Sequence, residues 1–222
     1  MQVTTPPDDT SGADGSDLST FGAGAGLTPT EDVRRRQIVD ATIAVLAELG
    51  YAKTSFARIV ERAGLSSTRM VSYHFAGKND LVQATLGTII DRQDAFVAER
   101  LGDEKDLRRL LLGQLAAEVA FVATHPREST ALVEIASHAG TADDADISPH
   151  VVYAVRVGRL ERQLVQGRRH GVFRDCDPKV MALAMRQAVD GVTLRLRREP
   201  DLDLDAYGRE LGELFDRAVR AD

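Results

Sequence analysis

Hydrophobic residues recur three or four positions apart along most of this 222-residue chain, from about residue 30 onward. That spacing gathers apolar side chains on one face of an α-helix, whereas a half-buried strand alternates at every second residue. Glycine, proline and helix-capping residues interrupt the pattern at intervals. We therefore predict an all-α protein of about nine helices, over residues 30–50, 54–64, 66–74, 79–100, 103–125, 128–139, 148–167, 178–198 and 204–221.

The ends of the predicted helices rest on residues that cap or break helices. Serine, threonine, aspartate and asparagine accept hydrogen bonds from the free amides of a first helical turn, and glycine commonly follows a last turn. Gly50 and Gly64 end the first two predicted helices. The predicted caps are Thr30, Thr54 or Ser55, Ser66 or Ser67, Asn79 or Asp80, Ser148 and Asp177.

Composition changes sharply before the first predicted helix. Residues 1–30 are rich in Gly, Ser, Thr, Pro and Asp, and they bury too little apolar surface to offset the entropy of an ordered chain. We therefore predict a disordered, acidic tail. Its glycine-rich stretch 22–26 lacks the preceding strand and the following lysine of a phosphate-binding loop, which favours a linker. The polar segment 140–147 is a second predicted loop.

The distribution of charge along the chain indicates which classes of partner it can bind. The chain carries a formal charge of −6, yet residues 31–80 hold eight Lys or Arg against six Asp or Glu, whereas the segments on either side are net negative. An acidic protein still binds nucleic acid where its positive charge is local. The single Cys176 excludes an internal disulfide, and no apolar run reaches the ~20 residues of a membrane span. Because the N-terminus also lacks a signal-peptide pattern, we expect a cytoplasmic protein that contacts no membrane.

Patterns for catalysis or metal binding do not stand out in the sequence. The histidines lack the i, i+4 pairing of a zinc site, and the acids beside Cys176 disfavour a reactive thiolate. No Ser-His-Asp, Cys-His or paired-carboxylate arrangement has supporting context. We expect no enzyme, no cofactor and no metal.

Two short predicted helices, 54–64 and 66–74, are joined by a turn that contains Gly64. That outline is typical of a helix-turn-helix, whose second helix enters the DNA major groove. The second helix presents serines, a threonine, Arg69 and Tyr73, with Met70 and Phe75 expected inside. Arginine pairs with guanine, and hydroxyl groups reach bases or phosphates. A three-helix subdomain with a polar surface and no DNA contact is the alternative at this point.

The stretch 36–81 resembles the TetR family of bacterial transcriptional regulators. The matching residues are Arg36, Ile38, Ala41, Gly50-Tyr51, Thr54-Ser55, Ile59, Ala63-Gly64-Leu65-Ser66, Tyr73-His74-Phe75, Lys78 and Leu81. Gly64 and Phe75 are one residue further apart than is usual in the family, so the turn or the recognition helix is longer by one residue.

The resemblance implies a DNA-binding domain over residues 31–78 that binds double-stranded operator DNA. Arg69 is expected to read bases or contact phosphate, and Tyr73 and Lys78 are expected to contact phosphate. Arg36 belongs to a basic triplet that clamps a phosphate, enters the minor groove or stays solvated. The full set of expected DNA contacts is Arg36, Thr54, Ser55, Ser66, Ser67, Thr68, Arg69, Ser72, Tyr73, His74 and Lys78, although His74 is better placed to pack or cap.

For residues 79–222 the resemblance implies a helical domain that binds an effector and forms a homodimer. The expected dimer interface lies on helices 178–198 and 204–221, through Val189, Val192, Leu211, Leu214, Phe215 and Ala218. A small, largely apolar effector is expected to contact Phe121, His125, Tyr153, Met181 and Met185, although core packing also explains each of these residues.

The expected protein is thus a dimeric repressor, bound to the bacterial nucleoid when on DNA, that an effector releases from its operator. The alternative is a helix-turn-helix regulator without a small ligand, controlled by its abundance or by a protein partner.

Overall fold

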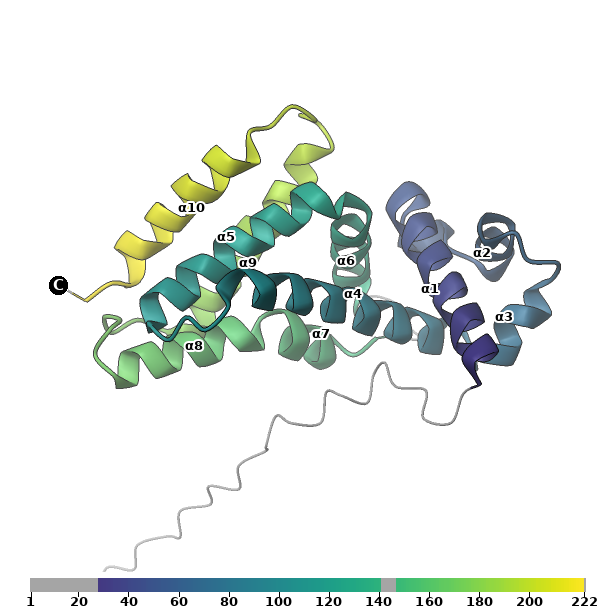
Figure 1. The fold of residues 1–222 in the computed structure, drawn as a ribbon, viewed down its shortest axis with the longest axis horizontal. Helices are drawn as coiled ribbons and strands as arrows, with labels where there is room; N and C mark the ends of the chain where they lie inside the picture. Colours follow the sequence, from purple (N-terminus) through teal and green to yellow (C-terminus); the bar gives the residue numbers. More distant parts are fainter. Residues whose placement is uncertain (1–27, 141–146, 222) are drawn as a thin grey trace, which may run out of the picture.

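The computed structural model describes residues 28–140 and 147–221. The predicted tail up to residue 27 and most of the predicted loop 140–147 therefore lie outside the described residues. The described chain is helical apart from one isolated β-bridge, and none of its helices is long and apolar enough to cross a membrane. Figure 1 shows α1, α2 and α3 gathered at one end and α5, α8, α9 and α10 toward the other, with the long α4 running between them and α7 below the middle of α4.

The first group comprises α1 (Pro29–Leu49), the short 3-10 helix η2 (Tyr51–Lys53), α2 (Phe56–Ala63) and α3 (Thr68–His74). The chain continues through α4 (Lys78–Leu101), α5 (Leu107–Thr124) and α6 (Pro126–His138). It ends with α7 (Pro149–Arg156), α8 (Gly158–Arg169), α9 (Pro178–Leu196) and α10 (Leu204–Val219).

The described residues form ten α-helices rather than about nine, because the predicted helix 148–167 is divided at Val157. The division lies directly before Gly158, and glycine supports a helix weakly.

The predicted start of α1 is wrong. Its N-cap is Thr28, not Thr30. The Thr28 side chain accepts a hydrogen bond from the Glu31 amide, and the Glu31 carboxylate reaches back to the Thr28 amide. Pro29 fills the first helical position, where its missing N–H is harmless. This reciprocal box satisfies more free amides than a single Thr30 hydroxyl would.

The predicted start of α4 is also wrong. The helix begins at Lys78 after Gly77, ahead of the expected caps Asn79 and Asp80. The Asp80 carboxylate instead reaches back across the turn and accepts a hydrogen bond from the Ala76 amide at 2.9 Å.

Two hydrophobic cores hold the helices together. The first core joins α1–α4 to α6 and α7, and the second is formed mainly by α5, α8, α9 and α10. α6 contributes Ala131, Leu132 and Ile135 to the first core. The first core therefore continues beyond residue 78, where the sequence predicted a domain boundary. Its fully buried side chains include Ile38, Leu46, Ile59, Phe75, Leu81 and Ile89.

The predicted extended connector 171–174 pairs with the end of α10. Phe173 and Arg220 form an antiparallel β-bridge, and the Arg174 amide donates to the Val219 carbonyl at 2.8 Å. The Phe173 ring lies so close to Gly167 of α8 that a Cβ at position 167 would be 2.0 Å from a ring carbon. Position 167 therefore accommodates glycine alone.

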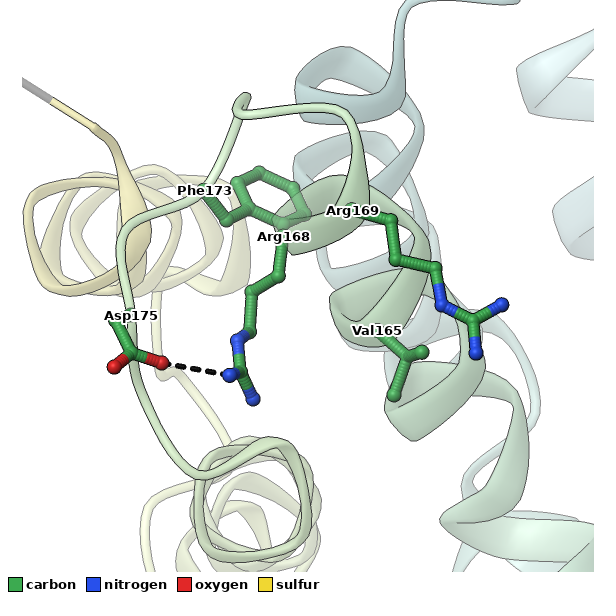
Figure 2. A pocket seen from close by; sticks show the side chains of 5 residues that line it. All are labelled: Val165, Arg168, Arg169, Phe173 and Asp175. Carbon is green, nitrogen blue, oxygen red and sulfur yellow. Dashed lines mark hydrogen bonds and ion pairs between the residues drawn. The ribbon is translucent and has the colours of Figure 1, made fainter. Parts of the chain in front are cut away.

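A surface hollow of about 370 Å³ lies beside this connector. Figure 2 shows Arg168 turned toward Asp175, with an ion pair of 2.6 Å, while Arg169 is directed away. Val165 and Phe173 supply its apolar side.

Candidate nucleic-acid interface

The turn between α2 and α3 is built around Gly64. Ser55 caps the start of α2 by accepting a hydrogen bond from the Arg58 amide at 3.4 Å. At the other end, Gly64 adopts the left-handed conformation (φ 64°, ψ 32°), and the Leu65 amide donates to the Val60 carbonyl at 3.0 Å. This ending satisfies the last carbonyls of α2 and redirects the chain into α3.

One face of α3 is fixed on the first core. Val71 and Phe75 are almost completely buried. The Arg35 guanidinium of α1 lies 4.2 Å from the centre of the Phe75 ring and donates to the His74 carbonyl at 2.8 Å. The opposite face of α3 is therefore held toward solvent.

That outer face carries five of the predicted DNA contacts. The hydroxyl of Ser72 donates back to the Thr68 carbonyl at 3.3 Å. Arg69 forms no ion pair with any acid in the part of the chain that the structure describes. A short projecting helix with a free guanidinium and several hydroxyl groups suits the major groove. The five exposed residues are Ser67, Thr68, Arg69, Ser72 and Tyr73, with exposed Ser66 just before them.

Two other predicted contacts are differently placed. Thr54 is buried, and its hydroxyl donates to the Gly50 carbonyl at 2.9 Å, so its side chain holds the turn after α1 and does not reach the surface. Arg36 is exposed but pairs with Asp32 at 2.9 Å and lines a hollow between α1 and α2. Neither side chain joins the outer face of α3.

Lys78 and His74 are half-buried. The Lys78 ammonium lies 4.2 Å from the centre of the Tyr51 ring, a cation–π contact between the starts of α4 and η2. Burial, as the largest effect, lowers the pKa of His74, so the imidazole is neutral at neutral pH. His74 therefore adds no positive charge to the surface.

Sequence reasoning missed the contact between Glu31 and Tyr73. The Tyr73 hydroxyl donates to the Glu31 carboxylate at 3.0 Å, across 42 positions of sequence. Hydrogen bonds from Thr28, with a smaller contribution from Tyr73, lower the pKa of Glu31, and the same contact raises the pKa of Tyr73. The available signal was the Thr-x-x-Glu box, which fixes Glu31 in space.

The residues predicted to line an effector pocket lie in separate places. Phe121 is fully buried and stacks on His125, with ring centroids 4.4 Å apart. Met185 is fully buried in the second core, and Met181 packs against that core. Tyr153 lines a surface hollow beside α8. A pocket that all five share stays a prediction.

Buried ion pairs join α7 to α9 and α9 to α5, and these pairs were not predicted. Arg156 of α7 donates to both carboxylate oxygens of Asp190 on α9, at 3.2 and 2.5 Å. Arg186 of α9 pairs with Glu118 of α5, and both side chains are 4% exposed. Burial, as the largest effect, lowers the pKa of Arg156. The signal in the sequence was an Arg and an Asp four residues apart within an otherwise apolar helix face.

Four of the six predicted dimer contacts lie inside the protomer. They are 7% exposed or less and pack in the second core, so they cannot also form a surface. The 3–4 spacing of apolar residues on these helices identified a buried face. It did not show whether the same protomer or a second copy covers that face. The buried four are Val189, Val192, Leu211 and Phe215, whereas Leu214 is 59% exposed and Ala218 is half-buried. α9 exposes other apolar side chains, Val180, Leu183 and Leu194.

Three helices around one core, with a glycine turn before a projecting polar helix, define a helix-turn-helix protein. Residues 38–85 match the family model described as bacterial regulatory proteins, tetR family. The N-terminal region of the chain is thus similar to the TetR family, in agreement with the resemblance seen in the sequence.

A relative and two solved structures extend the comparison. The HTH-type transcriptional regulator BetI 2 of Chromohalobacter salexigens is 37% identical over 86 residues, which are 38% of this chain and 41% of that protein. The chain thus matches less than half the length of this relative. A protein of known structure described as a TetR-family regulator, from Rhodococcus sp., is 25% identical, with a TM-score of 0.69 over 81% of this chain and 95% of its own.

A regulator from Saccharomonospora viridis, solved in complex with choline, is 17% identical, with a TM-score of 0.67 over 85% of this chain and 98% of its own. This likeness concerns the fold. All three of these proteins are described as transcriptional regulators, none as an enzyme.

Proposed function

We propose that this chain is a sequence-specific DNA-binding transcriptional regulator that reads its operator with α3. The observation that carries the proposal is the exposed polar face of α3, set on the glycine turn within the residues that match the family model. Arg69 supplies the free guanidinium, and Ser67, Thr68 and Ser72 supply hydroxyl groups that reach base edges or phosphates.

The regulator acts as a homodimer. Val180, Leu183 and Leu194 on α9 and Leu214 on α10 are between 45% and 66% exposed, which is unfavourable unless another surface covers them. A second copy of the chain provides such a surface by two-fold symmetry. Two copies present two α3 helices about one turn of DNA apart, roughly 34 Å, and therefore favour a near-palindromic site.

The regulator is a cytoplasmic repressor that a small effector releases from DNA. The effector releases the protein by favouring a state in which the two α3 helices are spaced wrongly for the operator. Such control needs a coupling free energy of ~1–3 kcal/mol. The buried Arg156–Asp190 and Arg186–Glu118 pairs lie in the effector-binding half, which favours an effector with a polar group beside its apolar part. Control without a small ligand is the second candidate, and the complete burial of Phe121 and Met185 favours it.

Choline, the ligand of the Saccharomonospora viridis regulator, is a first probe for these two candidates. A compound that binds the folded protein alone raises its Tm, and the rise grows with the logarithm of its concentration above the dissociation constant. A choline-dependent rise in Tm together with release from DNA supports effector control. Binding of DNA that is unaffected by choline and by a wider metabolite panel supports the second candidate.

The DNA-binding proposal is tested by fluorescence anisotropy with DNA from beside the protein's own gene and with a random-sequence pool. We expect Arg69→Ala to weaken specific binding by ~1–3 kcal/mol. Arg109→Ala is the control, because it removes an exposed arginine charge on α5 (71% exposed), away from α3, that pairs with nearby Glu104. Failure of the wild-type protein to select any sequence from the pool would overturn the proposal.

A further inference from the structure

Tyr73 is the largest exposed side chain on α3, at 72% exposed, and its hydroxyl is already bonded. It donates to one oxygen of the Glu31 carboxylate at 3.0 Å. The other oxygen of Glu31 accepts from the amide and the hydroxyl of Thr28, at 2.9 and 2.8 Å. Glu31 is thus fixed by the first turn of α1 and in turn fixes the direction of the Tyr73 hydroxyl.

This arrangement decides which hydrogen bonds Tyr73 can still make. A tyrosine hydroxyl has one hydrogen to donate, and an ionised carboxylate only accepts. The hydrogen bonds from Thr28 lower the pKa of Glu31 and keep it ionised at neutral pH. While the contact holds, the Tyr73 oxygen has lone pairs but no hydrogen to offer.

A phosphate oxygen is therefore an unsuitable partner for Tyr73. Phosphate oxygens accept hydrogen bonds and carry negative charge, so they meet neither a donor nor a favourable field beside Glu31. In the major groove, the donors are the exocyclic amino groups of adenine (N6) and cytosine (N4). Guanine and thymine present acceptors to the major groove, and an acceptor placed against an acceptor is repelled.

We propose that Tyr73, held by Glu31, is a specificity-determining residue that accepts a hydrogen bond from the exocyclic amino group of adenine or cytosine. The inference rests on the proposed function and replaces the phosphate contact expected for Tyr73 from the sequence. Glu31 is a positioning residue, because it acts through the hydroxyl of Tyr73.

The experiment starts from a random-sequence selection with the full wild-type chain. The inference predicts one position of the selected site, in each half, that requires adenine or cytosine. That base is then replaced by an analogue without the amino group in the major groove: 2-aminopurine for adenine, or 2-pyrimidinone for cytosine. Dissociation constants are measured for natural and substituted DNA with the wild type and with Tyr73→Phe, Glu31→Ala and Asp32→Ala.

We expect the analogue to weaken wild-type binding about tenfold, within the range of a single mismatched position. Tyr73→Phe should bind natural and substituted DNA equally well, because the acceptor is absent. Glu31→Ala should discriminate less than the wild type, because its Tyr73 hydroxyl is no longer held in one direction and can donate as well as accept. Asp32→Ala removes the same charge one residue away and should retain the tenfold ratio. The readout is the ratio of the dissociation constants of one variant for the two DNAs. Removing an acidic residue strengthens the binding of both DNAs alike, so this general effect cancels in the ratio.

Two results would overturn the inference while leaving the proposed function intact. One is a Tyr73→Phe variant that binds all sequences more weakly and still discriminates against the analogue, which would indicate a phosphate contact. The other is a variant with wild-type affinity and wild-type discrimination. Failure of the wild-type chain to select any sequence would instead refute the proposed function itself. Thermal unfolding of each variant, with Thr28→Ala as a control for loss of the helix cap, shows that the fold is retained.

Discussion

Replacing Arg186 with methionine tests whether the buried charges on α5, α7 and α9 depend on one another for their stability. Methionine keeps much of the length and apolar stem of arginine and removes the guanidinium. Glu118 would then be left 4% exposed, with one hydrogen bond from the Gln114 side chain at 2.9 Å. Asp190 would retain Arg156, which contacts both of its carboxylate oxygens.

The magnitude follows from the two ways in which Glu118 can respond. Leaving a buried charge without its partner costs roughly 3–5 kcal/mol. The carboxyl can instead take up a proton, which for an ordinary glutamate costs about 3.7 kcal/mol at pH 7 and about 1 kcal/mol at pH 5. The response that costs less free energy determines how much stability the variant loses. We therefore expect the free energy of unfolding to fall by ~3–4 kcal/mol at pH 7. For a chain of this size that corresponds to a fall in Tm of roughly 6–16 °C.

The assay is chemical and thermal unfolding of wild type, Arg186→Met, Glu118→Gln and the double variant, at pH 7 and pH 5. The double variant has no unpaired charge at this point and should recover most of the loss, giving a positive coupling free energy. The deficit of Arg186→Met relative to wild type should shrink by about 2 kcal/mol or more at pH 5. A loss below about 1 kcal/mol at pH 7, or a loss independent of pH, would refute the reasoning.

Three further predictions concern other parts of the molecule. Gly167→Ala should lower Tm by several degrees, because its Cβ would meet the Phe173 ring at 2.0 Å, and adding Phe173→Leu should recover part of the loss; an unchanged Tm would contradict this. Hydrogen bonding from Arg108 holds the pKa of Asp216 below its ordinary value of 3.8, so this pair stabilises the fold above that pH and is lost as the pH falls through the lowered pKa. Acid unfolding of Arg108→Gln should therefore begin at higher pH than that of wild type, and identical acid transitions would count against the pair. Leu214→Asp should shift sedimentation toward the monomer without lowering helicity, whereas an undiminished dimer would remove α10 from the interface.

Much of the fold follows from local sequence signals. Helix spacing, Gly64 and the serine caps predicted α2 and α3, because such signals act over a few residues. The start of α1 was missed since two caps competed, and the box formed by Thr28 and Glu31 satisfies more amides than Thr30 alone. The division at Val157 was missed because apolar spacing continues through it.

The candidate site was predictable where it depends on one helix and not where it depends on two. The exposed face of α3 follows from its own sequence. The contact of Tyr73 with Glu31 and the pairing of Arg186 with Glu118 join residues 42 and 68 positions apart, and no local pattern encodes such distances. The same limit explains the dimer residues, since periodicity identifies a buried face without saying whether its own protomer or a second copy buries it.

The position of α6 limits how DNA-binding domains can be exchanged between regulators. α6 packs on α1, α4 and η2 on one side and on α5 and α9 on the other. A chimera joined after residue 78 would place a foreign α6 under α1 and lose the fit of Leu132 and Ile135 to the first core. A DNA-binding domain moved into another regulator therefore keeps its native stability only if the first half of α4 and the inner face of α6 are moved with it. α6 begins almost fifty residues after a junction at residue 78.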